Sequence, residues 1–365
     1  MSKRYLIIGC LLCVGIAAFA IKPKPLVYNG DTLPQSDIFR RSKCGVVSEA
    51  ISIPEVSGIA CSRVTPGYIW MESDDHESYI IATDAKGEKR ACTLKMSKSI
   101  GWDWEDMSGG VYEGKNYLFI GSFGDNEEKR TDYRIIWFEE PAIDSVDKPE
   151  QVVTPNYIKY VYPDGKSHNN EALMYDNVEQ MIYIITKVYY NVCQVFSLPF
   201  RLDYGSETQT LTYVCDLGVK SDLGDGTNPY KGFHLVTAAD ISPDGKYVLI
   251  KNHNNIQAIY SWVLYWEREG NESIAETVKR QPVVLDCYQY EWQGEAICWL
   301  DDDTFYTTSD SDGEPPIYKY TRRGAEGIDQ TRKDHSQCAK YIMNGQLYIR
   351  RGDQIYTIAG QPVKQ

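Results

Sequence analysis

Basic residues are scarce in this chain of 365 residues: 38 Lys and Arg stand against 51 Asp and Glu, so the formal net charge is −13. Nucleic-acid binding needs clustered Lys and Arg, and the composition therefore argues against a nucleic acid as partner. Histidine is also rare, with 5 residues, and no C-x-x-C pair occurs beyond residue 20. A structural zinc site is therefore not expected.

Signatures of several enzyme classes are missing as well. The chain contains no G-x-S-x-G nucleophile elbow, no Walker or dinucleotide-binding fingerprint and no H-E-x-x-H metal motif. These absences exclude, at the level of motifs, an α/β-hydrolase serine, a P-loop nucleotide site and a zincin. Helical periodicity is almost absent beyond residue 50.

The N-terminal twenty residues have the layout of an export signal. Lys3 and Arg4 precede an apolar run that ends in the small-x-small pattern Ala18-Phe19-Ala20, which predicts cleavage after Ala20. The apolar run has 16 residues, fewer than the roughly 20 that a spanning helix needs. A lipobox-like Cys10 lies too early in the chain to be an acylation site. We expect export to the periplasm, the cell surface or the medium, with no integral membrane segment after cleavage. The eight cysteines that remain permit disulfides but fix no pairing.

The body of the chain reads as β-structure. Short runs rich in Tyr, Ile, Val and Thr recur between Gly, Asp, Asn and Pro, which is the pattern of strands bounded by turns. The clearest runs are Tyr79 to Thr83, Tyr117 to Gly121, Tyr133 to Phe138, Met181 to Lys187, Lys246 to Lys251, Ile259 to Trp266, Thr304 to Thr308 and Ile317 to Tyr320.

A loose internal repeat indicates which all-β architecture the chain adopts. Its copies are Ser57-Gly58-Ile59, Glu105-Asp106-Met107, Glu171-Ala172-Leu173, Ala239-Asp240-Ile241 and Glu295-Ala296-Ile297. Each copy leads into a second strand that ends in polar residues, and the copies lie 48 to 68 residues apart. This spacing is typical of propeller blades with four strands. We predict an all-β propeller of antiparallel four-stranded blades, with five blades favoured and a sixth left open.

The same reading divides the chain into four parts. They are a signal peptide (1–20), an N-terminal extension (21–50), the propeller (51–335) and a C-terminal β tail (336–365). The sixth blade, if present, would combine residues 43–54 with the C-terminal hairpin.

The repeat also places the acidic residues. Side chains two apart share a face of a strand, so Glu55, Asp103, Glu105, Glu171 and Glu295 are predicted to converge on the mouth of the central channel, with Asp106 and Asp240 at neighbouring positions of opposite parity. Such acids can bind the backbone of the next blade, hold a cation or act in acid–base catalysis. Lys187, Lys251 and Arg134 are candidate partners. Asp310-x-Asp312-Gly313 and Asp222-x-x-Asp225-Gly226 also resemble fragments of calcium-binding loops.

Several signatures occur in a fixed order along the chain. They are Trp102-Asp103-Trp104-Glu105-Asp106, Gly124-Asp125-Asn126, Glu171-Ala172-Leu173, Ala239-Asp240-Ile241-Ser242-Pro243-Asp244-Gly245 and Gln293-Gly294-Glu295-Ala296-Ile297. In this order they resemble a group of secreted bacterial β-propeller proteins, distantly similar to propellers grouped as phytase-like or esterase-like. The sequence departs from that group after Trp70, where Met71-Glu72-Ser73-Asp74-Asp75 follows. This departure argues against a site in the loop of the first blade.

Two functions stay open at this point. One is a binding module that takes a small-molecule, glycan or protein ligand at the acidic mouth, through Glu55, Asp103, Asp106, Asp125, Asn126, Asp240 and Asp310. The other, implied by the resemblance, is a hydrolase in which Glu105, Asp106, Glu171 and Glu295 hold Ca²⁺ and Lys187 or Lys251 neutralises developing charge. The tail at 339–364 resembles the β-rich sorting signals of exported Bacteroidetes proteins, although its strands would also suit the closing of the last blade.

Overall fold

The structure is a computed structural model. It describes residues 26–144, 149–188, 192–221, 234–254, 260–310, 313–325, 338–343, 346–351 and 354–357. The predicted signal peptide and the calcium-loop fragment at 222–226 lie outside these residues, as does Asp312 of the second fragment.

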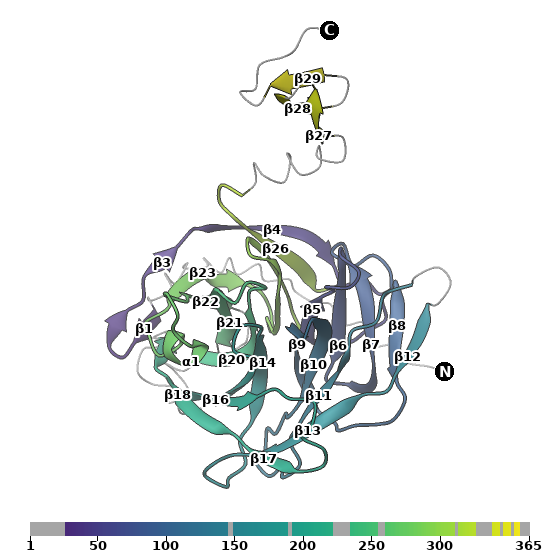
Figure 1. The fold of residues 1–365 in the computed structure, drawn as a ribbon. Helices are drawn as coiled ribbons and strands as arrows, with labels where there is room; N and C mark the ends of the chain where they lie inside the picture. Colours follow the sequence, from purple (N-terminus) through teal and green to yellow (C-terminus); the bar gives the residue numbers. More distant parts are fainter. Residues whose placement is uncertain are drawn as a thin grey trace, which may run out of the picture.

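Five sheets stand around a common centre, each with one strand facing the channel (Figure 1). The inner strands contact one another in sequence around a closed ring. Blade 1 contains β5 (Val56–Cys61), β6 (Tyr68–Ser73), β7 (His76–Asp84) and β8 (Cys92–Met96). Blade 2 contains β9 (Trp104–Tyr112), β10 (Lys115–Ser122), β11 (Arg134–Glu139) and β13 (Asn156–Val161). Blade 3 contains β14 (Asn170–Asp176), β15 (Met181–Thr186), β16 (Cys193–Pro199) and β18 (Thr212–Leu217).

The remaining two blades complete the ring. Blade 4 contains β20 (His234–Ile241), β21 (Tyr247–Asn254), β22 (Tyr260–Glu267) and β23 (Val283–Tyr290). Blade 5 contains β24 (Ala296–Asp301), β25 (Thr304–Thr308), β26 (Pro316–Arg322) and, as its outer strand, β4 (Phe39–Val46). The prediction of an all-β propeller with five four-stranded antiparallel blades is confirmed. Within the described ranges, no sixth sheet joins the ring.

The closing strand comes from the N-terminal side of the chain. β4 pairs antiparallel with β26 from Phe39↔Arg322 to Val46↔Pro316, so it belongs to the ring although the sequence analysis set residues 21–50 aside as an extension. The outer position in blade 5, for which the tail was one candidate, is therefore filled by β4. The tail strands β27 (Cys338–Met343), β28 (Gln346–Arg351) and β29 (Gln354–Thr357) pair with one another.

Blades 2 to 5 also reach back to the blade before them. Three short parallel strands cross in this way: β12 (Glu150–Val153) joins the edge of blade 1, β17 (Thr208–Thr210) that of blade 2 and β3 (Gln35–Ser36) that of blade 4. The helix α1 (Ile274–Thr277) performs the same task between blades 4 and 3, because the Ile274 N–H donates to Glu179. These crossings cover edge strands that would otherwise be open to pairing with other chains.

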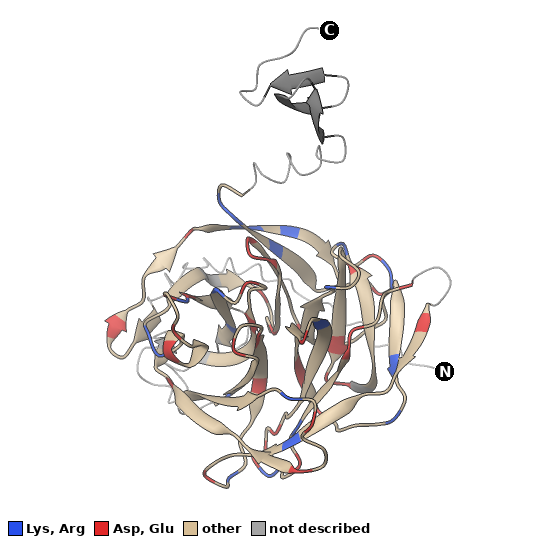
Figure 2. Ribbon diagram, in the orientation of Figure 1, with Lys and Arg blue, Asp and Glu red and all other residues tan. Residues whose placement is uncertain are grey.

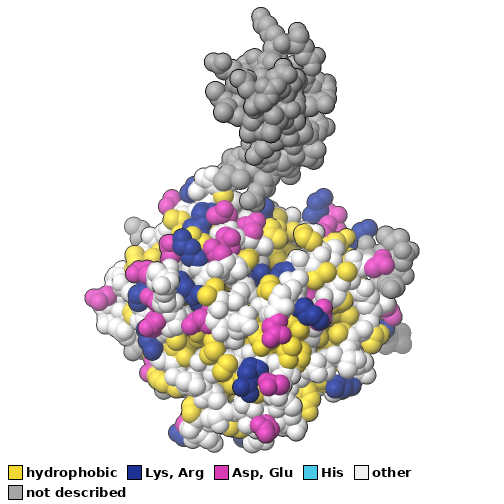
Figure 3. Space-filling view, in the orientation of Figure 1, with side chains coloured by type: hydrophobic (Ala, Val, Ile, Leu, Met, Phe, Trp, Pro, Cys, Tyr) yellow, Lys and Arg dark blue, Asp and Glu magenta, His cyan; other side chains and the backbone are white. Residues whose placement is uncertain are grey.

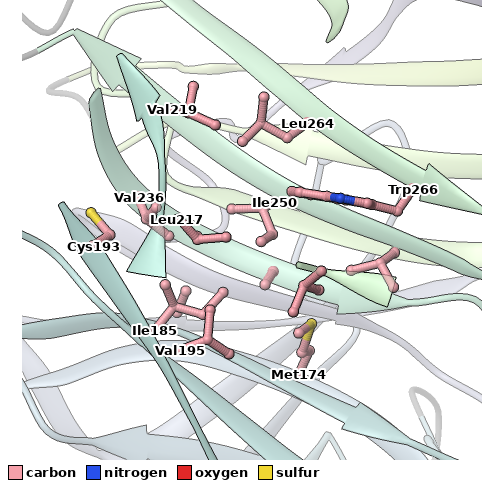
Figure 4. Packing of buried hydrophobic residues seen from close by; sticks show 14 of the residues in the cluster. Met174, Ile185, Cys193, Val195, Leu217, Val219, Val236, Ile250, Leu264 and Trp266 are labelled. Carbon is pink, nitrogen blue, oxygen red and sulfur yellow. The ribbon is translucent and has the colours of Figure 1, made fainter. Parts of the chain in front are cut away.

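The core lies between the blades. Between blades 3 and 4, Met174, Ile185 and Val195 pack against Ile250 and Trp266 (Figure 4). These side chains are at most 2% exposed, and burying one such side chain contributes about 1.5–3 kcal/mol. A small sheet of β1 (Leu26–Tyr28), β2 (Asp31–Thr32) and β19 (Val219–Ser221) adds Leu26 and Val219 to this core.

Cysteine contributes to the core as the free thiol. Among the described residues Cys44, Cys61, Cys92, Cys193, Cys215 and Cys298 are free thiols. Cys61 and Cys298 lie on the neighbouring inner strands of blades 1 and 5, with their sulfur atoms 3.4 Å apart.

Candidate functional site

The channel mouth is built from equivalent positions in the five blades. The pairing of the first and second strands is interrupted by a bulge near the start of the inner strand in blades 1 to 4. A bulge redirects side chains and ends regular pairing. At the bulge and its equivalent in blade 5 stand Ser57, Glu105, Glu171, Thr237 and Glu295. The facing ends of the second strands carry Asp74, Phe123, Lys187, His253 and Asp310.

This register corrects one copy of the predicted repeat. In blade 4 the residue equivalent to Glu171 is Thr237, because Val236 pairs with Asn252 and Ala238 with Lys251. The sequence pattern had placed Ala239 there, two residues too late. Asp240 therefore lies deeper in the ring than the mouth acids.

The backbone at the mouth is strained at three equivalent places. Glu55, Asp103 and Gln293 each stand two residues before the bulge position, and their φ angles are 46°, 58° and 41°. Residues other than glycine rarely adopt positive φ, and such conformations cluster at functional sites. The strained residues lie at the mouth in blades 1, 2 and 5, and this side of the mouth is therefore a candidate site.

Two of the predicted ligand-binding acids are structural. One oxygen of Asp106 accepts the N–H groups of Leu173 (2.8 Å) and Ala239 (3.0 Å), which belong to blades 3 and 4. Asp240 accepts the Trp299 N–H of blade 5 at 2.8 Å and the Ser108 hydroxyl of blade 2 at 3.0 Å. Both side chains are buried, and their oxygens satisfy backbone groups that have no water to bind.

Asp125 is likewise occupied within its own loop. Its oxygens accept the N–H groups of Lys129 (2.9 Å) and Arg130 (2.8 Å) and the Tyr133 hydroxyl (2.6 Å). The exposed Asn126 accepts a hydrogen bond from Asn169 at 3.2 Å. Asp125 therefore stabilises the loop that connects β10 and β11, and Asn126 is an exposed residue of the same loop.

A lysine stands where the sequence predicted a metal ion. The Lys187 ammonium lies 3.2 Å from Glu171 and 3.6 Å from Glu295. His253 is 3.6 Å from the same Glu295 oxygen. Burial alone would raise the pKa of Glu295, but Lys187 and His253 hold that pKa below its usual value. Within the predicted metal set of Glu105, Asp106, Glu171 and Glu295, oxygens of Glu171 and Glu295 face Lys187, and one oxygen of Asp106 accepts two backbone N–H groups.

Glu105 is the least compensated member of that set. Burial and the neighbouring Glu171 raise its pKa well above the usual value. It also depends on a glycine: a Cβ at Gly124 would lie 2.1 Å from one Glu105 oxygen and 2.6 Å from the Asp103 carboxyl carbon. Gly124 therefore permits two carboxyl groups to approach the same turn.

The blade 1 side of the mouth holds a cluster that the sequence analysis missed. Oxygens of Glu55, Asp74 and Asp75 all lie within 4.8 Å of one another. Burial raises the pKa of Asp74 to about 7, with Glu295 and Glu55 adding to the shift. Asp310, on the neighbouring blade, has its pKa raised to about 8 by burial, Glu295 and Asp74. We call Glu55, Asp74 and Asp75 the acidic triad.

Glu72 lies one layer deeper, on the same side of its strand as Asp74. It is 0% exposed, and neither of its oxygens makes a hydrogen bond of normal geometry with a described residue. Burial, and then the charge of Asp74, raises its pKa well above the usual value. The segment after Trp70, where the sequence analysis did not expect a site, therefore supplies Glu72, Asp74 and Asp75. The register of second-strand ends is the signal that points to them.

Lys251, the other lysine predicted to neutralise developing charge, faces a carboxylate of blade 4. It is fully buried and its ammonium lies 2.9 Å from Glu291. Glu291 is also 3.4 Å from Arg41 of β4 and accepts the Thr307 hydroxyl at 3.1 Å. Lys251 is thus part of a contact between blades 4 and 5.

Comparisons with known proteins found similar chains among solved structures only. No model of a known family matches the chain, and no curated protein matches it either. Among solved structures, Chaetomium thermophilum Raptor is similar over 77% of this chain, at 9% identity and a TM-score of 0.37, and this chain spans 29% of its length.

Two structures of bacterial proteins are similar at the same level. One is a protein of unknown function from Bacteroides thetaiotaomicron (10% identity, 78% of this chain and 76% of that chain, TM-score 0.36). The other is a proposed 6-phosphogluconolactonase from Bacteroides uniformis (10% identity, 85% and 84%, TM-score 0.34). At these values the likeness carries no argument about activity. Within the described residues, no helix has the length and apolar character to cross a membrane.

Proposed function

We propose that the protein is a ligand-binding propeller that holds a divalent cation, Ca²⁺, at the acidic triad of its channel mouth. The observation that carries this proposal is Glu72, a fully buried carboxyl without a normal hydrogen bond, behind three carboxyl groups within 4.8 Å of one another. A buried carboxyl group becomes neutral, in line with the raised pKa of Glu72, unless it is paired or coordinates a metal. A cation in the triad would supply the positive charge that these groups lack.

The chemistry of the triad favours a hard cation. All three candidate ligands are carboxylates, whereas zinc and copper sites draw on cysteine or histidine. Ca²⁺ takes six to eight oxygen ligands in flexible geometry and suits an irregular loop better than Mg²⁺, which demands a near-ideal octahedron. Asp75 is exposed, so a cation held there would have coordination positions open to the oxygen atoms of a ligand. That ligand would be a small molecule, a glycan or a protein segment.

Calcium titration with thermal unfolding tests the proposal. We expect Ca²⁺ to raise the midpoint temperature of the protein, and we expect Asp74→Asn and Glu72→Gln to abolish most of that rise while they remain folded. Asp31→Asn, which changes an exposed acid on β2, is the matched control and should respond like the unmodified protein. An unchanged midpoint at millimolar Ca²⁺, or a rise that both triad-side variants retain, would contradict the proposal.

The same geometry does not favour the hydrolase. Lys187, which was to neutralise developing charge, is already held by Glu171 and Glu295. Lys251 is buried against Glu291. Absence of turnover on a panel of phosphate and carboxylate esters in the presence of Ca²⁺ is the expected result, and turnover that Glu171→Gln removes would restore the alternative.

We also propose that the protein is exported, on the strength of residues 1–20 alone. Sequencing the N-terminus of the protein purified from its host tests this, since cleavage after Ala20 gives a chain that begins at Ile21. An intact Met1 would contradict it.

A further inference from the structure

Two cysteines meet at the point where the ring closes. Cys61 is the last residue of β5, the inner strand of blade 1, and Cys298 lies in β24, the inner strand of blade 5. Their sulfur atoms are 3.4 Å apart, and both side chains are buried. The pair therefore spans the contact between the first and the last inner strand of the propeller.

The alternation of side chains along the two strands directs both thiols into the same layer of the core. Ile59 and Cys61 are two residues apart and share a face of β5, as Ala296 and Cys298 do on β24. All four side chains belong to one buried cluster between blades 1 and 5. The residue before each cysteine belongs instead to the cluster on the other side of its blade. The two sulfur atoms thus approach because the strand register places them there.

The separation of the sulfur atoms leaves a short distance to a covalent bond. A disulfide holds its sulfur atoms about 2.05 Å apart, so the two atoms, now 3.4 Å apart, must approach by roughly 1.4 Å. A small rotation about the Cα–Cβ bond of each cysteine is sufficient for this movement. Cys44, by contrast, faces the carbonyl oxygens of Ala85 and Ile317, each at 3.4 Å.

We infer that Cys61 and Cys298 form a disulfide bond that joins blades 1 and 5. The structure holds both as free thiols, which is the reduced state of such a pair. The oxidant is a small-molecule disulfide. One cysteine thiolate attacks a sulfur atom of this donor and releases one donor thiol, and the second cysteine then attacks the mixed disulfide and releases the other. The two cysteines lose two protons and two electrons in total, and the donor takes them up as two thiols.

The bond makes the inner ring of the propeller covalently closed. The two cysteines are 237 positions apart, and the chain between them contains the inner strands of blades 2, 3 and 4. At the outer edge, the ring is closed by strand pairing between β4 and β26 alone. A disulfide that encloses a long loop restricts the unfolded chain more than one that encloses a short loop. We therefore expect the oxidised chain to unfold at a higher temperature than the reduced chain.

Peptide mapping of the full chain tests the inference. One sample is the native protein held with oxidised glutathione. The other is refolded from denaturant in a mixture of reduced and oxidised glutathione, which gives the donor access before the two blades pack together. Free thiols are then alkylated under denaturing conditions. We expect a peptide that joins Cys61 to Cys298 and that reductant separates. The inference is overturned if both cysteines are alkylated in both samples, or if they are bound only to glutathione or to other cysteines.

Thermal unfolding of variants shows whether this bond accounts for the difference in stability. In the unmodified protein, the midpoint temperature of the oxidised chain should exceed that of the chain with dithiothreitol by several degrees. Cys298→Ala should remove the difference, and Cys61→Ala should do the same. Cys215→Ser, in blade 3, is the control and should keep both the joined peptide and the difference in midpoint. A difference that both alanine variants retain would contradict the inference.

Discussion

The channel mouth and the outer strand β4 of blade 5 differ in the charge of their side chains and in the burial of those side chains. At the mouth, the strand register places several carboxyl groups close together. Burial and the neighbouring carboxylates raise the pKa of Asp74 to about 7 and that of Asp310 to about 8. Along β4, Arg40 and Lys43 are exposed to solvent. Figure 2 shows the Lys and Arg segments along this strand. In the view of Figure 3, acidic, basic and hydrophobic side chains are interspersed over the surface of the propeller.

The comparison teaches that charge alone does not mark a site. Surface ion pairs such as Lys95–Glu150 and Lys115–Glu139 join exposed side chains and contribute little to stability. The mouth differs from them because its carboxyl groups lie close together and largely out of water, which raises the pKa values of Asp74 and Asp310. Glu291 lies between the two regions and binds Lys251 on one side and Arg41 on the other.

We expect the largest change in the free energy of unfolding from Asp106, which contacts backbone groups of other blades and not a ligand. Asp106→Ala should lower the free energy of unfolding by about 4 kcal/mol, because the buried N–H groups of Leu173 and Ala239 lose their acceptor. Urea unfolding measures the loss, and Asp106→Asn, which keeps one acceptor oxygen, should lose less. The calcium response should persist in the folded fraction. A loss below about 1 kcal/mol would show that Asp106 does not anchor blades 3 and 4.

Glu291 tests the connection between the two regions. Glu291→Ala leaves Lys251 and Arg41 without their shared carboxylate, and removal of one partner from a buried pair costs about 3 kcal/mol or more. The exposed Glu139→Ala, which removes a partner of Lys115, is the control and should change the free energy by less than about 1 kcal/mol. Equal effects of the two substitutions in urea unfolding would contradict the account.

A smaller effect is expected from pH. Asp74 and Asp310 have higher pKa values in the folded chain than in the unfolded chain. At pH values between the unfolded and the folded pKa, the folded state therefore binds more protons than the unfolded state. Stability therefore falls as pH rises through about 7 to 8, by on the order of 1 kcal/mol. Calcium should reverse this trend, because it favours the ionised carboxyls. Asp74→Asn combined with Asp310→Asn should flatten the profile. A stability that rises over this pH range would contradict the assignment.

The sequence predicted the fold and part of the mouth, for identifiable reasons. Alternating strands and the repeat were sufficient for five blades, and Glu105, Glu171 and Glu295 do occupy equivalent positions. The triad, by contrast, depends on a turn in blade 1 that brings Asp75 and Asp74 back beside Glu55, and no periodicity encodes that approach.

The sequence also did not predict which group each carboxylate binds. Whether a carboxylate faces a ligand, a lysine or a backbone amide is decided by neighbouring blades, as Asp106 and Glu171 show. The closing strand was missed for a related reason: β4 lies far from β26 in the sequence, and its pairing partner is fixed only when the ring closes.

The central claim is that the mouth holds its carboxyl groups together for a cation. Calorimetric titration of Ca²⁺ near pH 7.5, repeated in two buffers with different heats of ionisation, tests it most directly. The account predicts saturable binding of one Ca²⁺ with release of roughly one proton, because Asp74 and Asp310 are partly protonated at that pH. No saturable heat, or binding without proton release, would contradict it.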